Sequence, residues 1–189
     1  MNLSGTVNAL RLLYAPRQFI PGVSVATFAQ LPVPIPPRKD GGEIKVVVLD
    51  KDNCFAVPHE NRVFPDYMQK WEELKKHYPG DRLVIVSNTA GSSDDGDGKL
   101  AATLEANTGV KVLPHTQKKP GCHQEIESFF KTRGLITDAN QIAVVGDRLM
   151  TDVLMANLMG AQSVWISKGV VPSKNVLVKF ERCLYNALK

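Results

Sequence analysis

The chain has 189 residues, of which 43% are hydrophobic and 22% charged, and a formal net charge of +4. Such a chain is long enough for one globular domain with a substantial core, and its mild basicity favours anionic substrates or surfaces without identifying them. Three scattered cysteines exclude a disulfide framework and a CxxC metal pair and favour a reducing compartment, and no apolar run reaches the roughly 18 residues of a membrane-spanning helix.

The first 39 residues contain no acidic side chain and four basic ones. Apolar residues recur there at helical spacing: Leu3, Val7, Leu10 and Tyr14. This pattern predicts an amphipathic helix that contacts a membrane surface, that targets the chain to an organelle, or that packs on the domain or on another subunit. The sequence LPVPIPP then predicts an extended connector. We therefore expect residues 1–43 to be an N-terminal segment separate from a catalytic domain at 44–189.

From residue 44 onward, apolar runs typical of strands alternate with helical patterns. The predicted strands are 44–49, 83–86, 110–113, 142–145 and 164–166. The predicted helices are 65–78, 99–107, 121–133, 151–159 and 176–188, and the acidic stretch GSSDDGDG at 91–98 is predicted to be a flexible, solvated loop. This alternation predicts an α/β fold with a doubly wound, Rossmann-like parallel sheet, in which ligands bind beyond the carboxyl ends of the strands.

Polar side chains follow four of these strands in turn. They are Asp50 and Asp52, then Ser87 and Asn88, then Lys118 and Lys119, and finally Asp147, Arg148 and Asp152. Asp50 and Asp52 project to the same side of the chain, and like charges so close destabilise each other's ionised forms. The pair is functional if one group is ionised and its neighbour carries a proton.

The four segments resemble the signature motifs of the haloacid dehalogenase-like phosphatases: DKDN, VIVSNT, KKPG and GDRLMTD. The resemblance implies that Asp50 is a nucleophile that forms an aspartyl-phosphate and that Asp52 is the general acid and base. It also implies that Ser87 and the neighbouring Asn88 segment hold the phosphate. Lys119 then neutralises charge, although Lys118 is the alternative lysine.

The same resemblance implies a Mg²⁺ site made by Asp50, Asp147 and the main-chain carbonyl of Asp52, with Asp152 nearby. The charges agree with this. At about 4 Å, two unit charges interact by roughly 4 kcal/mol at an effective dielectric constant near 20, so a carboxylate that attacks a phosphate dianion needs positive charge around it. One Mg²⁺ and one lysine supply enough if Asp52 is neutral, as a general acid must be.

The spacing between the motifs leaves no room for a large cap domain, so we expect an open site and a large substrate. A closer resemblance, to the mitochondrial phosphatidylglycerophosphate phosphatases of fungi, rests on LDKDNC, IVSNTAG, KKPGC and GDRLMTD. It implies hydrolysis of phosphatidylglycerophosphate to phosphatidylglycerol for cardiolipin synthesis, by a peripheral protein on the matrix side of the inner mitochondrial membrane. Lys51, Lys118 and Arg148 are candidates for contact with the lipid's inner phosphate.

Other functions remain open from the sequence. One is a capless phosphatase acting on phosphoproteins or nucleic-acid ends, although no arginine-rich or aromatic track favours nucleic acid. Another is a receiver-like phosphoacceptor module, which also has an acceptor Asp, a Ser or Thr and a Lys at a sheet edge but lacks an acid in the position of Asp52. An inactive membrane scaffold and a homo-oligomer are further hypotheses.

Overall fold

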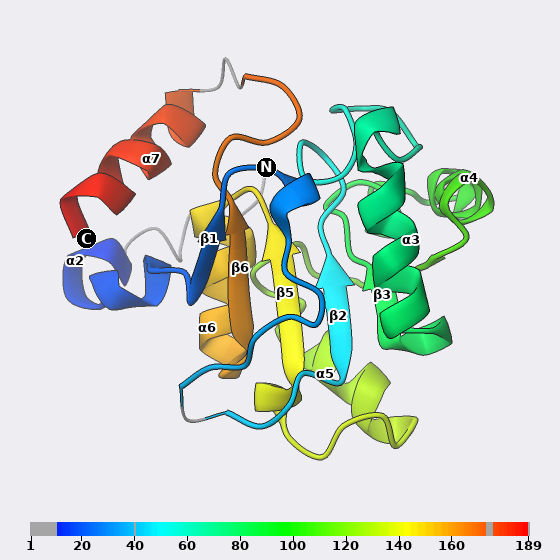
Figure 1. Cartoon of the computed structure of the whole chain (residues 1–189), viewed down its shortest axis with the longest axis horizontal. Helices are drawn as coiled ribbons and strands as arrows, with labels where there is room; N and C mark the ends of the chain where they lie inside the picture. The colour runs from blue at the N-terminus through cyan, green and yellow to red at the C-terminus, as the bar shows by residue number, and fades with distance from the viewer. Residues whose placement is uncertain (1–10, 40, 173–175, 189) are drawn as a thin grey trace.

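The computed structural model of the chain describes residues 11–39, 41–172 and 176–188. Within these ranges, six parallel strands form one sheet in the order β1-β6-β5-β2-β3-β4 (Figure 1). The strands are Val23–Val25 (β1), Val46–Leu49 (β2), Leu83–Ile85 (β3), Lys111–Val112 (β4), Ile142–Gly146 (β5) and Gln162–Ile166 (β6). The α-helices are Arg11–Tyr14 (α2), Met68–His77 (α3), Lys99–Thr108 (α4), His123–Thr132 (α5), Leu154–Met159 (α6) and Val176–Leu188 (α7). The predicted doubly wound α/β fold is confirmed.

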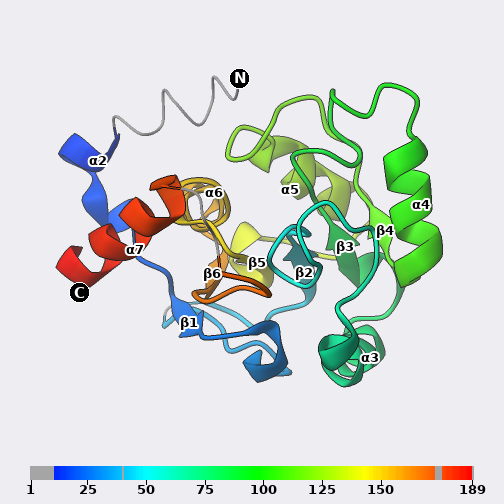
Figure 2. The same cartoon turned by 90° about the horizontal axis from the view of Figure 1, so that it is seen from above.

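Strand β2 lies in the middle of the sheet because its side chains are apolar on both faces. Val46 and Val48 belong to a core cluster with side chains of α5 and α6. Val47 and Leu49 point the other way, into a larger cluster that includes α3 and α4. The sheet is therefore covered on both faces, as Figure 2 shows from above, and its strand ends are left to carry polar groups.

The N-terminal segment is more closely joined to the domain than the sequence predicts. Residues Val23–Val25 form the edge strand β1, which pairs with β6. Phe28, Leu31 and Ile35 are buried in the core, and the Ile35 amide donates a hydrogen bond of 3.0 Å to the Tyr78 hydroxyl. Residues 23–35 therefore pack against the part of the chain that begins at residue 44. A strand of three residues is too short to give a periodic signal, which is why the sequence did not predict it.

The predicted amphipathic helix cannot be compared with the structure over most of its length, because Leu3, Val7 and Leu10 lie outside the described residues. Of that stripe, only Tyr14 is described, and it is 69% exposed at the end of α2. Among the described helices, none is long and apolar enough to cross a membrane.

The acidic loop after β3 is held by one buried carboxylate. Asp95 is only 8% exposed, and its side chain accepts backbone hydrogen bonds from Gly91, Leu100 and Ala101 at 2.9 to 3.0 Å. These bonds fold the loop back on itself and satisfy amides in the first turn of α4. The loop is thus anchored at its centre, whereas the sequence predicted a flexible segment.

Replacing Asp95 with Ala should lower the free energy of unfolding by about 1–2 kcal/mol, the usual cost of removing a helix-capping side chain. Hydrogen bonds from the Gly91 amide and then from α4 hold the pKa of Asp95 below its ordinary value. Its stabilisation is therefore complete above the unfolded pKa near 4 and is lost as the pH falls through the lower folded pKa. Urea denaturation at pH 7 and at successively lower pH measures both effects. An Asp97→Ala control, at an exposed position of the same loop, should cost less.

Candidate active site

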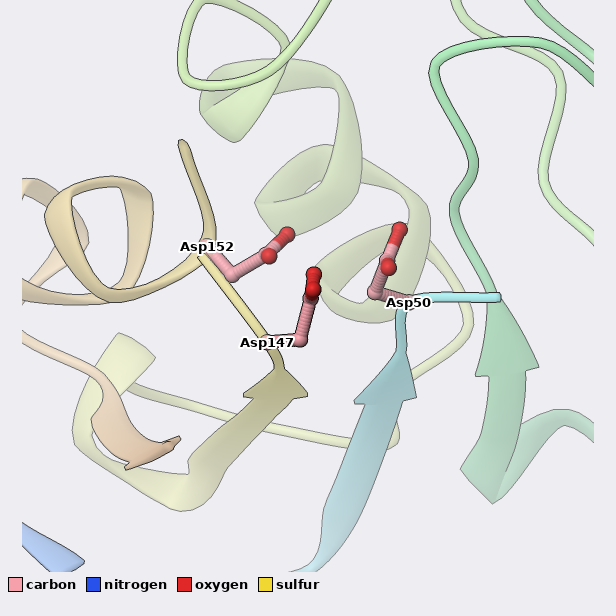
Figure 3. A group of neighbouring side chains, drawn as sticks. All are labelled: Asp50, Asp147 and Asp152. Atoms are coloured by element: carbon pink, nitrogen blue, oxygen red, sulfur yellow. The ribbon is translucent and has the colours of Figure 1, made fainter. Parts of the chain in front are cut away.

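Three aspartates meet at the carboxyl edge of the sheet. Asp50 follows β2, Asp147 follows β5, and Asp152 lies in the π-helical turn Leu149–Val153 that precedes α6. Each offers a carboxylate oxygen, and these oxygens all lie within 4.8 Å of one another. Figure 3 shows the three carboxyl groups near one another, beyond the ends of the strands that lead to Asp50 and Asp147. A set of oxygen ligands at this spacing suits Mg²⁺.

The strand register brings the first two of these residues together. β2 and β5 are parallel neighbours with Leu49 beside Val145, and the Asp50 amide donates a hydrogen bond of 2.8 Å to the Val145 carbonyl. Any side chains that follow the two strands must therefore emerge side by side. Asp152 joins them because position 146 is glycine. A β-carbon at Gly146 would lie 2.3 Å from the Asp152 carboxyl carbon, a distance that real structures essentially never show.

The electrostatics of the cluster fit a bound cation. Burial raises the pKa of Asp50 to about 7, with a further contribution from Asp152 that is opposed by Lys119. Burial and the nearby Asp50 and Asp152 carboxylates also raise the pKa of Asp147 well above its ordinary value. Anions that repel each other in a buried site are stabilised in their ionised forms by a divalent cation. The three carboxylates therefore pass the test of an Mg²⁺ site on both geometry and charge.

Lys119 is the lysine at this site. Its ammonium group donates hydrogen bonds to Asp50 and, at 2.6 Å, to Asp152. The side chain is 1% exposed. Burial opposes its charge, but Asp152 and Asp50 outweigh burial and raise the pKa of Lys119. Lys118 instead pairs with Asp94 of the acidic loop at 2.5 Å and does not line the cavity described below.

Asp52 has a charged partner that the sequence did not reveal. Its Oδ1 accepts a hydrogen bond of 2.5 Å from Lys51 Nζ and one of 2.8 Å from the His59 amide. Lys51 itself is buried and also donates to the Glu60 carbonyl. The side chain of Asp52 therefore lies outside the carboxylate cluster, although it lines the same cavity.

Ser87 and Asn88 follow β3 at the same edge. Asn88 lines the cavity, and its Oδ1 accepts a hydrogen bond of 2.8 Å from the Lys119 amide. Ser87 is 1% exposed and its hydroxyl lies 3.0 Å from that of Thr89. Asn88 thus joins the β3 edge to the lysine segment. The phosphate contact expected of Ser87 stays a prediction.

Asn53 is a site residue that motif spacing alone did not identify. Its Oδ1 accepts hydrogen bonds from the Val170 and Val171 amides at 3.0 and 2.9 Å, and its Nδ2 lies 3.4 Å from Asp147 Oδ2. A β-carbon at Gly169, where φ is +71°, would lie 2.3 Å from Nδ2 of the Asn53 side chain. Asn53 therefore joins the loop after β6 to the carboxylate cluster, and this loop can pack so closely only with glycine at 169.

These residues surround an open cavity of about 460 Å³. Its lining includes Asp50, Asp52, Lys119 and Asp147 on the sheet side. Arg148, the loop residues Val171 and Pro172, and Val178 of α7 form another part of the wall. The arrangement combines a cluster of three carboxylates, an ammonium group and a further carboxylate, Asp52, in the cavity wall, and phosphoryl transfer can use such groups.

Comparison with known proteins gives the family. A family model described as "Mitochondrial PGP phosphatase" matches residues 3–171. The chain is 54% identical to "Phosphatidylglycerophosphatase GEP4, mitochondrial" of Saccharomyces cerevisiae over 100% of its own length and 99% of that protein. The chain belongs to the mitochondrial PGP phosphatase family.

One further relative and one solved structure are also similar to the chain. The "Probable phosphatidylglycerophosphatase, mitochondrial" of Schizosaccharomyces pombe is 30% identical over 100% of this chain and 93% of its own length. A crystal structure of an uncharacterized protein from Listeria monocytogenes serotype 4b covers 69% of this chain and 84% of its own, with 16% identity and a TM-score of 0.48. The sequence similarity to the two fungal proteins covers the whole chain.

Mg²⁺ should raise the thermal midpoint of unfolding, because a ligand that binds only the folded state stabilises it. A hundredfold excess of ion over its dissociation constant adds about 2.7 kcal/mol. Asp147→Asn should lose most of this shift, whereas Asp81→Asn, at an exposed carboxylate paired with Arg133, should keep it. Equal shifts in the three proteins would remove Asp147 from the metal site.

Lys119→Met should lower the free energy of unfolding in EDTA by about 3 kcal/mol, since buried carboxylates lose the ammonium that compensates them. Lys118→Met removes only a surface pair and should cost less than about 1 kcal/mol. Urea denaturation midpoints of the two variants decide between the lysines. A larger loss for Lys118→Met would contradict the assignment.

Proposed function

We propose that this protein is a Mg²⁺-dependent phosphatase that hydrolyses phosphatidylglycerophosphate to phosphatidylglycerol through an aspartyl-phosphate on Asp50. The observation that carries the proposal is the meeting of Asp50, Asp147, Asp152 and Lys119 at one sheet edge in a chain of this family. The names of the relatives support the lipid substrate and a mitochondrial location. The product would serve cardiolipin synthesis on the matrix side of the inner membrane.

In the first half of the reaction, an Asp50 carboxylate oxygen attacks the phosphorus of the terminal phosphate. A bond forms between this oxygen and phosphorus, and the bond from phosphorus to the glycerol oxygen breaks. Asp52 gives its proton to the departing oxygen, so that this oxygen leaves as a neutral hydroxyl group of phosphatidylglycerol. Lys51 and the His59 amide hold the Asp52 side chain at the cavity wall for this transfer.

In the second half, Asp52 takes a proton from water, and the water oxygen attacks the phosphorus of the aspartyl-phosphate. The bond between phosphorus and the Asp50 oxygen breaks, which releases inorganic phosphate and restores the carboxylate. Lys119 remains beside Asp50 throughout and offsets the negative charge that gathers on the phosphoryl oxygens. Asp152 keeps the ammonium group in place through its hydrogen bond of 2.6 Å.

Asp50, Asp147 and Asp152 would hold Mg²⁺ through their carboxylate oxygens, with the Asp52 main-chain carbonyl as the further ligand expected from the motif. When bound, the ion supplies positive charge that reduces the repulsion between the nucleophilic carboxylate and the phosphate dianion. The sheet edge holds these two carboxylates in fixed positions, because Asp50 and Asp147 continue directly from paired strands.

An open cavity agrees with a substrate whose acyl chains remain in a bilayer. The described helices contain no membrane span, which fits a peripheral protein reaching a head group at the surface. The acid-free N-terminal segment is proposed to contact an anionic leaflet or another subunit, because basic residues near such a surface gain roughly 1 kcal/mol each.

Phosphate release from vesicles containing phosphatidylglycerophosphate tests the proposal, with an aryl phosphate as the soluble control and an oligonucleotide phosphate and a phosphopeptide as competing substrates. Wild-type protein should release phosphate from the lipid in Mg²⁺, lose activity in EDTA and regain it when Mg²⁺ returns. Asp50→Asn should lower turnover by at least about 10⁴-fold, since nucleophilic catalysis is lost, while its circular dichroism spectrum stays that of the wild type.

Other outcomes would point to a different function. Stoichiometric phosphorylation of the wild type without turnover would indicate a receiver-like phosphoacceptor. Preference for the oligonucleotide or the phosphopeptide over the lipid would overturn the substrate while keeping the chemistry. Turnover by Asp50→Asn near the wild-type rate would remove Asp50 from the nucleophilic role.

A further inference from the structure

Arg148 in the cavity wall is held by a buried carboxylate from a distant part of the chain. Its Nε donates to both carboxylate oxygens of Glu181, at 3.0 and 3.2 Å. Glu181 is 1% exposed and lies on α7. The Arg148 side chain keeps 26% of its surface exposed and lines the cavity. Among the residues that the structure describes, none accepts a hydrogen bond from its terminal nitrogens Nη1 and Nη2.

Helix α7 fixes the segment after β5 at two more points. Glu181 also accepts a hydrogen bond of 3.3 Å from the Met150 amide. The Tyr185 ring lies 4.7 Å from that of Trp165, whose Nε1 donates a hydrogen bond of 2.9 Å to the Asp147 carbonyl. Val178 of the same helix lines the cavity. The helix lies at the β1 end of the sheet, near α2 and α6 (Figures 1 and 2), and through these side chains it contacts the segment next to the carboxylate cluster.

The other cations considered for the lipid's inner phosphate have different partners. Lys51 is buried between Asp52 and the Glu60 carbonyl, and Lys118 pairs with Asp94 outside the cavity. Lys119 is occupied by the carboxylate cluster. Among the described residues that line the cavity, Arg148 is therefore the basic residue whose terminal N–H groups can contact a ligand.

We propose that Glu181 is a positioning residue that orients the Arg148 guanidinium for contact with a second anionic group of the substrate, the phosphodiester. This inference rests on the proposed function. A head group that carries a terminal monoester and an inner diester presents two anions joined by a glycerol. The monoester is bound at Asp50, and Arg148 at the cavity wall is placed to meet the diester. Guanidinium nitrogens suit this contact because a planar pair of N–H donors matches two phosphate oxygens.

Fixing the guanidinium through Nε has a physical consequence. A buried carboxylate that receives Nε restricts the long arginine side chain to one orientation before substrate arrives, so less conformational freedom is lost on binding. Both hydrogen bonds to Glu181 come from Nε, so the pair does not use the outer two nitrogens. Glu181 therefore sets substrate preference without touching substrate.

The test compares kcat and KM on phosphatidylglycerophosphate vesicles with those on an aryl phosphate, which has no second phosphate. Arg148→Ala should lower kcat/KM for the lipid by about 10- to 100-fold, mainly through KM, because a charge-assisted contact is lost. It should change kcat/KM for the aryl phosphate by less than about threefold. Glu181→Gln should lower kcat/KM for the lipid, relative to kcat/KM for the aryl phosphate, by about 5- to 20-fold. Glu127→Gln, which removes a carboxylate of the exposed pair with Lys131 on α5, should change neither substrate.

A double-mutant cycle separates positioning from a general structural effect. If Glu181 acts through Arg148, Glu181→Gln should add no further loss of lipid preference in an Arg148→Ala background. Should Glu181→Gln unfold, the double variant Arg148→Ala/Glu181→Leu removes both partners of the buried pair. Proteins often tolerate the loss of both partners better than the loss of one. That variant should fold and show the lipid preference of Arg148→Ala alone.

The outcomes distinguish this inference from the proposed function. Equal losses on lipid and aryl phosphate in Arg148→Ala, or an additive effect of Glu181→Gln in the Arg148→Ala background, would overturn the role of Glu181 while leaving the phosphatase assignment intact. Wild-type protein that hydrolyses the aryl phosphate but not the lipid would overturn the proposed substrate, and this inference with it.

Discussion

The site depends on one electrostatic constraint, which is that three carboxylates share a buried space with a single ammonium group. The parallel pairing of β2 with β5 forces Asp50 and Asp147 to leave the sheet side by side. Asp152 joins them from the turn before α6, and Lys119 binds two of the three. Such an arrangement is unfavourable for a protein that does not bind positive charge, because burial and repulsion both oppose ionisation. A divalent cation would offset this cost, as the proposed function requires.

Much of this could be predicted because the chemistry is tied to strand ends. The runs VVVL, LVIV and IAVV are apolar without alternation, which indicates strands buried on both faces, and polar residues follow each at once. Parallel strands present their carboxyl ends at one edge, so residues far apart in sequence were assigned to one site without any tertiary information. Lys119 was preferred over Lys118 on the resemblance alone, and the structure brings Lys119 to the cluster.

Other features were beyond the reach of sequence patterns because they depend on tertiary contacts between short or irregular segments. β1 has three residues and is defined by its pairing with β6. Asn53 acts through backbone amides of a loop more than a hundred residues away. Glu181 lies on a helix that was predicted correctly, but a lone acidic residue on a helix carries no sign that it is buried against an arginine. The partner of Asp52 was missed for another reason, since neighbours in sequence seldom form buried ion pairs.

Gly146 shows how the reaction centre relies on a residue that has no functional group. The carboxylate of Asp152 occupies the space that a β-carbon would fill at this position. Even a methyl group there would push the anion away from Lys119, and a steric change of one atom would become an imbalance of charge beside the nucleophile. The requirement at position 146 is therefore for empty volume and not for any particular chemical group.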